Sequence, residues 1–333
     1  MSEAMAIAAV AAVAASSAAA LVWLGLGWLG AWRLNRLPSA PRGAEEFTFT
    51  PWELDAESEP VRLETADGVG LAGWFLPRPE SRRVVIAMHG YRGEMSQVLG
   101  ISTLLWRSGF NVLLFDFRGR GRSDRAPITM GMWEREDLTA ALDWIARRVP
   151  EPSIGLFGFS MGAVVALRCG DDPRVDAVVA DSAFASQREV LEHVARADAA
   201  RLPGGWIRGS WFLPAVEWWH RRRGKPPFDA VAPIEALDGL AGTPLLFVHG
   251  ERDRTVPVEQ ARRMVEAAPE PKEAWFVPDA LHCGAYFVDR RAYVERIAGF
   301  LDRSLAEGGP RGPAGGQRRM AGEPGRTQAG GGA

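Results

Sequence analysis

A serine between two glycines is the residue of this sequence with the clearest chemical potential. Ser160 lies in the pentapeptide GFSMG at 158–162, which follows an apolar run at 153–157 and precedes a small-residue run at 163–168. Strand, tight turn and helix in this order are the context in which a serine hydroxyl is presented as a nucleophile. The turn is sharp enough to require the glycines, because a Cβ at either position would clash with a neighbouring element.

A serine hydroxyl needs a base within hydrogen-bond reach and a group that orients this base. His282 is the predicted base, since it follows a predicted strand and histidine can accept and return a proton near pH 7. Asp253 precedes it and is the predicted acid that holds the imidazole in the required tautomer. Glu251 and Asp181 remain alternatives for the acid.

The other histidines have different predicted environments. His89 and His249 directly precede glycines at the ends of predicted strands, which indicates buried structural residues. His193 and His220 lie in a segment without strong strand patterns and are predicted to face solvent.

Backbone donors would have to stabilise an oxyanion at the substrate carbonyl. The predicted donors are the N–H of Met161, which follows the serine, and the N–H of Tyr91 in an earlier strand-end loop. Loss of one such donor typically costs on the order of 3 kcal/mol of transition-state stabilisation.

Strands and helices alternate along the chain that positions these groups. Apolar runs predict buried strands at 84–88, 111–115, 153–157, 175–180, 244–248 and 273–277. Helices are predicted at 97–107, 133–148, 260–267 and 293–305, and a hairpin at 61–65 and 71–76. This order predicts an α/β fold with a mostly parallel sheet covered on both faces, whose strand carboxyl ends carry the site.

Five motifs in this order resemble those of the α/β-hydrolase superfamily. They are His89-Gly90, Asp116-x-Arg118-Gly119-x-Gly121-x-Ser123, Gly158-x-Ser160-x-Gly162, Gly250-x-x-Asp253-x-x-Val256-Pro257 and His282. The chain is most similar to the branch of serine aminopeptidase-like and monoacylglycerol-lipase-like hydrolases that carry an N-terminal membrane anchor. The resemblance covers about 61–305 and implies the α/β-hydrolase fold.

The resemblance implies a serine hydrolase that cleaves a carboxylic ester through an acyl-enzyme, with a lipid-like substrate such as a monoacylglycerol or lysophospholipid. A thioesterase, an aminopeptidase-like amidase and an acyltransferase remain alternatives with the same triad. A catalytically silent scaffold is the alternative outside enzymes. Oligomeric state stays open, because one scaffold hosts many functions.

Composition limits the partners that we expect. The net charge of −2 over 333 residues gives no basic surface for nucleic acid. Cys169 and Cys283 stand at no metal-ligand spacing, so we expect neither a disulfide framework nor a zinc site, and the predicted chemistry requires no cofactor.

The N-terminus predicts a membrane anchor at 1–32. No charged residue occurs between Glu3 and Arg33, a run longer than the ~20 residues that cross a bilayer, and tryptophans cluster at its far end. A secretory signal peptide is the alternative, disfavoured by the acidic start, and a buried core helix is a third. Arg33, Arg36 and Arg42 follow the run and no basic residue precedes it, which predicts a cytoplasmic catalytic domain.

Three further segments complete the organisation. A linker is predicted at 33–60, and a disordered Gly/Pro/Arg tail at 306–333. A lid-like insertion is predicted at about 183–232, where tryptophans precede the run HRRR at 220–223. Its aromatic side chains could line an acyl pocket or rest at a membrane interface, or they could belong to ordinary helix packing with solvated arginines.

Overall fold

The computed structural model describes residues 3–35, 49–199 and 209–305. Most of the predicted linker, the insertion residue Trp206 and the predicted tail at 306–333 lie outside the described residues.

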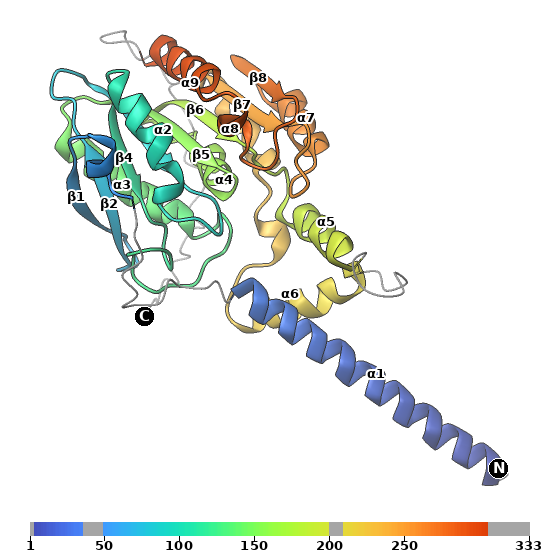
Figure 1. The fold of residues 1–333 in the computed structure, drawn as a ribbon. Coiled ribbons are helices and arrows are strands. Elements are labelled where there is room, and N and C mark those ends of the chain that lie inside the picture. The colour runs from blue at the N-terminus through green and yellow to red at the C-terminus, as the bar shows by residue number, and fades with distance from the viewer. Residues whose placement is uncertain (1–2, 36–48, 200–208, 306–333) are drawn as a thin grey trace, which may run out of the picture.

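Eight strands form one sheet in the order β1-β2-β4-β3-β5-β6-β7-β8 (Figure 1). The first two strands form the predicted antiparallel hairpin and β2 pairs antiparallel with β4, whereas the other neighbours are parallel. The strands are β1 Glu59–Glu64, β2 Gly70–Leu76, β3 Arg83–Met88, β4 Asn111–Phe115, β5 Ser153–Phe159, β6 Val175–Asp181, β7 Leu245–Gly250 and β8 Lys272–Val277. The predicted α/β fold with a mostly parallel sheet is therefore confirmed.

Helices cover both faces of this sheet. The α-helices are α1 Glu3–Asn35, α2 Ser96–Arg107, α3 Glu134–Arg148, α4 Met161–Arg168, α5 Gln187–Ala199, α6 Leu213–Arg222, α7 Val258–Ala267, α8 Ala285–Val288 and α9 Arg290–Ser304. Short 3₁₀ turns are η1 Pro51–Leu54, η2 Gly209–Phe212, η3 Phe228–Ala230 and η4 Pro233–Leu240.

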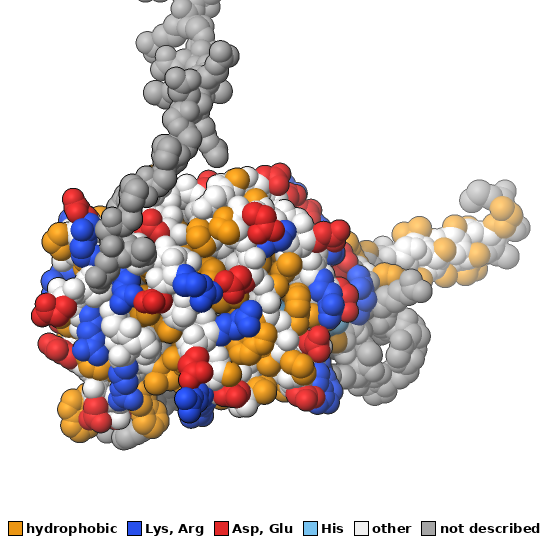
Figure 2. Space-filling view, turned by 90° about the horizontal axis from the view of Figure 1, so that it is seen from above, with side chains coloured by type: hydrophobic (Ala, Val, Ile, Leu, Met, Phe, Trp, Pro, Cys, Tyr) orange, Lys and Arg blue, Asp and Glu red, His pale blue; other side chains and the backbone are white. Residues whose placement is uncertain are grey.

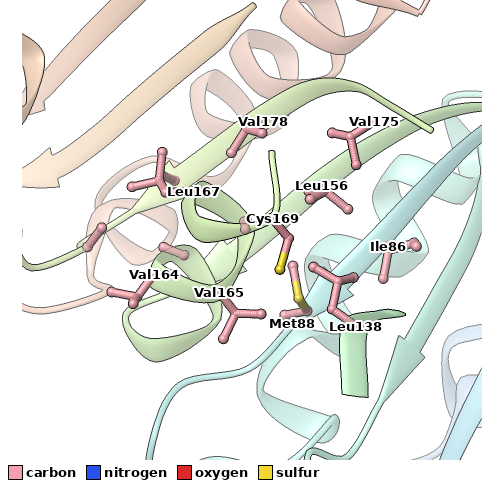
Figure 3. Packing of buried hydrophobic residues seen from close by; sticks show 14 of the residues in the cluster. Ile86, Met88, Leu138, Leu156, Val164, Val165, Leu167, Cys169, Val175 and Val178 are labelled. Carbon is pink, nitrogen blue, oxygen red and sulfur yellow. The ribbon is translucent and has the colours of Figure 1, made fainter. Parts of the chain in front are cut away.

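The core has two halves because successive residues of a strand point to opposite faces. Ile86 and Met88 of β3 pack with α3 and α4 on one face, as Figure 3 shows for Leu138, Val164 and Val165. Val85 and Ala87 of the same strand pack with α2 and α9 on the other face. The continuous apolar strand runs in the sequence are explained by burial on both sides.

Between β6 and β7 the chain leaves the sheet and forms α5, η2, α6, η3 and η4. The long helix α1 meets this region through its C-terminal half, and its N-terminal half projects away from the domain (Figure 1). One stretch of α1, Met5–Trp32, is long and apolar enough to cross a membrane by length and composition. Figure 2 shows its apolar side chains beside a domain face that mixes both signs of charge.

Candidate active site

Ser160 stands in a strained turn between β5 and α4. Its backbone has φ 52° and ψ −110°, a region that side chains with a Cβ seldom adopt. A Cβ on Gly158 would lie 2.2 Å from the carbonyl carbon of Gly162, and one on Gly162 would lie 2.5 Å from the Met88 carbonyl oxygen. Only glycine fits at either position, as the sequence pattern indicates.

The three residues nominated as nucleophile, base and acid lie in one hydrogen-bonded row. The distance from His282 Nε2 to Ser160 Oγ is 3.0 Å, and that from His282 Nδ1 to Asp253 Oδ2 is 2.6 Å. Since the carboxylate can only accept, Nδ1 carries the proton and Nε2 is left to accept from the serine hydroxyl. The loops after β5, β7 and β8 supply the three side chains.

The turn after β7 holds Asp253 rigidly. Its carboxylate is buried, and Oδ1 accepts the backbone N–H groups of Thr255 at 2.8 Å and Val256 at 2.9 Å. His249 Nε2 lies 2.9 Å from the Val256 carbonyl oxygen. Because a carbonyl oxygen only accepts, Nε2 is the donor of this bond, and burial lowers the pKa of His249. His249 is a buried structural residue, as predicted.

The two alternative acids make other contacts. Asp181 is fully buried, accepts from Tyr293 Oη at 2.6 Å and from Ser182 Oγ at 2.8 Å, and burial raises its pKa to about 6. Glu251 is exposed and pairs with Arg262 at 3.4 Å. Among the three candidates, Asp253 is the one hydrogen-bonded to His282.

Asp181 belongs to a buried network that supports the histidine loop. Ser182 Oγ accepts the backbone N–H of Cys283, the residue after His282, at 3.0 Å. Through Ser182 the loop after β8 is therefore tied to Asp181 and Tyr293. Sequence reasoning missed this network, because no spacing pattern links Tyr293 in α9 to the end of β6.

The loop after β3 lies against the elbow. Gly90 N–H donates to Gln97 Oε1 at 2.8 Å, and Arg120 donates to the Tyr91 carbonyl from Nε at 3.0 Å and from Nη2 at 2.6 Å. These bonds fix the backbone around the Tyr91 amide. The Met161 N–H begins α4 and has no intrahelical acceptor, so it is available to a ligand beside Ser160.

His89 connects the same loop, after β3, to the loop after β4. Its Nε2 accepts the backbone N–H of Phe117 at 3.0 Å, which binds the end of β3 to the loop after β4. Burial lowers the pKa of His89 to about 4. The prediction of a buried structural histidine is confirmed.

The prediction that His220 faces solvent is wrong. Its side chain is 3% exposed and packs on the Phe228 ring, and burial lowers its pKa to about 4. Leu213, which is also buried, precedes His220 by seven residues, so both side chains lie on the same side of α6. His193, also predicted to face solvent, is half-buried, and its Nε2 lies 3.0 Å from the Arg254 carbonyl.

A cavity of about 820 Å³ opens beside the serine and histidine. Its apolar lining comes from elements outside the sheet: Leu34 of α1, Met130, Phe184, and Val190, Leu191 and Val194 of α5. The Tyr91 hydroxyl donates to the Leu34 carbonyl, so the end of α1 is bonded to the loop beside Ser160. Sequence reasoning did not include Leu34, which is distant along the chain from every motif.

The row of side chains, the free Met161 N–H and the apolar cavity can together support nucleophilic attack on an apolar acyl group. Within the described ranges, no group of three or more His, Cys, Asp or Glu side chains could hold a metal ion. Cys169 and Cys283 are both buried, and burial raises their pKa values, that of Cys169 to about 11.

Known proteins are similar to this chain in sequence and in architecture. The serine aminopeptidase S33 family profile matches residues 79–211. The uncharacterized protein YfhR of Escherichia coli K12 is 30% identical over 267 residues, which cover 77% of this chain and 83% of YfhR. Protein bem46 of Schizosaccharomyces pombe is 28% identical over 85% of this chain and 90% of its own. The esterase Pf2001 of Pyrococcus furiosus superposes with a TM-score of 0.65 at 29% identity, covering 82% of this chain and 98% of the esterase.

Proposed function

The chain belongs to the α/β-hydrolase superfamily, and from that premise we propose that it is a membrane-anchored serine hydrolase that cleaves carboxylic esters with an apolar acyl chain. Monoacylglycerols and lysophospholipids are two examples of the lipid-like substrates that we propose. The observation that carries the proposal is the row Ser160–His282–Asp253 at the edge of an apolar-lined cavity. Similarity to an esterase adds support for ester cleavage.

Acylation begins when Ser160 Oγ attacks the ester carbonyl and its proton passes to His282 Nε2. Asp253 stabilises the imidazolium, and the amides of Met161 and Tyr91 donate to the oxyanion. The bond from the carbonyl carbon to the alcohol oxygen then breaks, and His282 returns the proton to the leaving alcohol. Water repeats the sequence on the acyl-enzyme, which releases the carboxylic acid and restores the serine.

Labelling with a fluorophosphonate probe tests the activated serine. We expect covalent labelling of the wild type and its loss in Ser160→Ala and His282→Ala. Ser96→Ala is the matched control, because Ser96 lines the same cavity without touching the row, and it should be labelled like the wild type. A folded wild type that resists the probe, or labelling that persists without Ser160, would overturn the mechanism.

A substrate series then separates ester cleavage from the alternatives. The apolar lining from α5 and α1 should favour medium and long acyl chains over acetate, through a lower KM. Matched esters, thioesters and amides of one acyl chain should be turned over with the ester fastest. If the thioester or the amide is hydrolysed faster than the ester, the protein is a thioesterase or an amidase that uses the same triad.

We also propose that α1 spans the bilayer and that the catalytic domain lies on the cytoplasmic side. An apolar stretch with three following arginines and no preceding basic residue supports both. An anchored protein should stay in the membrane fraction after an alkaline carbonate wash, with an intact N-terminus by mass spectrometry. A shortened N-terminus would identify a cleaved signal peptide instead.

A further inference from the structure

The C-terminal half of α1 is packed against the catalytic domain. Gly27 and Ala31 are buried, whereas Val10 and Leu21 toward the N-terminus are each 70% exposed. A Cβ on Gly27 would lie 2.3 Å from the Cβ of Ala215, so α1 and α6 approach closely enough to require a small residue at this crossing. A bilayer cannot surround α1 evenly at this level, because α6 already covers one side.

Two indole hydrogen bonds hold the crossing in place. Trp23 Nε1 donates to the Trp211 carbonyl at 3.0 Å, and Trp219 Nε1 donates to the Leu24 carbonyl at 3.1 Å. The part of α1 before Trp23 comprises about 20 residues, which rise about 30 Å and match the hydrocarbon core of a bilayer. The segment of α1 from Glu3 to Trp23 therefore fits a bilayer whose boundary lies near Trp23. This boundary is closer to the N-terminus than Trp32, the last tryptophan of α1.

The outer side of this region has the chemistry of a membrane interface. Trp211 is 62% exposed and Trp218 is 41% exposed, and tryptophan is enriched where bilayers meet water. Three consecutive exposed arginines follow at 221–223, and Arg222 lies over the Trp218 ring at 4.5 Å.

The acidic residue of α6 does not neutralise these arginines. Glu217 is bonded to Arg188 at 2.9 Å and also accepts the Phe228 N–H at 3.0 Å, so its charge is directed into the domain. A basic cluster beside a membrane span attracts anionic headgroups, and each arginine near the surface adds to this attraction.

We propose that η2 and α6 form a docking surface for an anionic lipid bilayer, with Trp211 and Trp218 at the headgroup level and the arginines at 221–223 against lipid phosphates. This inference rests on the proposed anchoring of α1. In this docked position, the side of the domain that faces the membrane is the side where α5 and Leu34 form the cavity wall. An acyl chain then passes from the bilayer into the cavity without crossing water.

The depth of α6 can be measured in the full-length protein reconstituted in lipid nanodiscs. Trp218→Cys carries an environment-sensitive fluorophore, and both native cysteines are buried and poorly reactive. Phe287→Cys on α8 is the control, since Phe287 is 71% exposed and Figure 1 shows α8 well away from α6. Doxyl-labelled lipids should quench the probe at 218 several-fold more than the probe at 287. Equal quenching at the two positions would overturn the proposal.

The charge requirement is tested with Arg221→Gln, Arg222→Gln and Arg223→Gln combined. In nanodiscs of phosphatidylcholine and phosphatidylglycerol, hydrolysis of a bilayer-resident acyl ester should fall about tenfold, and in phosphatidylcholine alone it should change little. The control combines Arg290→Gln, Arg291→Gln and Arg296→Gln, which remove the same charge from exposed positions of α9. Equal losses in the two triple variants would refute the docking surface.

A water-soluble short-chain ester and the fluorophosphonate label separate this inference from the proposed function. Both should be unaffected by the changes at 221–223. If the wild type neither hydrolyses the short-chain ester nor reacts with the fluorophosphonate, the serine mechanism is wrong, whatever the position of α6.

Discussion

The loops that carry the candidate triad and the crossing of α1 with α6 are built in different ways, although Leu34 at the end of α1 lines the cavity beside Ser160. Ser160, Asp253 and His282 each follow a strand of one parallel sheet, and hydrogen bonds within the loops hold them. α1 and α6 meet through contacts between residues nearly 200 positions apart, such as Trp219 and Leu24. The comparison teaches that the sheet positions the candidate triad, while packing outside the sheet shapes the cavity beside it.

The sharpest test of the candidate triad compares two buried aspartates. Asp253→Asn should lower kcat on a short ester by about 10⁴, because the amide favours the wrong histidine tautomer. Asp181→Asn should stay within tenfold of the wild type, since Asp181 bonds to Tyr293 and Ser182. Steady-state kinetics on the two purified variants decides between them. Comparable losses would show that both carboxylates orient the histidine.

Acid should loosen the α6 region through His220. Burial lowers its pKa to about 4, aided by the charges of Lys225 and Arg223, so the folded state binds fewer protons than the unfolded state between about pH 4 and 6.5. The free energy of unfolding is therefore unaffected by His220 above pH 6.5. It decreases as the pH falls from 6.5 toward 4, by up to about 3 kcal/mol.

Hydrogen exchange of α6 amides at pH 7 and pH 5 measures this loss, and His220→Gln should remove most of the difference between the two. His193→Gln is the control, because His193 is only half-buried. Unchanged acid sensitivity in His220→Gln would assign the effect to another group.

The α1–α6 crossing is tested by a pair of glycines on the same helix. Gly27→Val should destabilise the crossing by roughly 1–3 kcal/mol, because its Cβ would meet Ala215. Gly25→Val should be harmless there, since nothing lies within 4 Å of a Cβ at that position. Limited proteolysis of α6 in detergent micelles compares the two. Similar cleavage rates would mean that the close approach carries no stability.

The smallest expected effect lies at the joint between the two regions. Tyr91→Phe removes the hydroxyl that donates to the Leu34 carbonyl, a bond worth about 1 kcal/mol. Burial raises the pKa of Tyr91 to about 12, so the hydroxyl stays a donor at any working pH. KM for a long-chain ester should rise up to about fivefold, with kcat for acetate unchanged. A fall in kcat for acetate would place the hydroxyl in the chemistry itself.

Local patterns were enough to predict much of the fold and the nominated site. A buried parallel strand appears in the sequence as a continuous apolar run, so the strands could be located. A turn this sharp requires glycine, so the elbow between Gly158 and Gly162 could be located as well. Because parallel strands end at one edge of the sheet, residues after β5, β7 and β8 had to lie near each other. Asp253 was the preferred acid, but excluding Asp181 required coordinates, since Asp181 ends β6 and Asp253 follows the neighbouring strand β7.

Helix packing outside the sheet could not be predicted in the same way. The inward turn of His220 depends on which side of α6 faces η3, and the place of Leu34 in the cavity wall depends on where α1 crosses α6. The place of Leu34 is a long-range packing outcome that leaves no periodic mark near it, whereas the spacing of His220 from Leu213 indicates burial only once the side of α6 that faces η3 is known.

The sequence by itself determined the sheet, the order of its loops and the residue types that could react, because each follows from local sterics and burial. Only the tertiary structure decided that Asp253 rather than Asp181 or Glu251 contacts His282, that His220 is buried and that Leu34 at the end of α1 lines the cavity. These depend on side chains brought together from distant parts of the chain, where shape and hydrogen-bond geometry select one arrangement among several that the pattern allows.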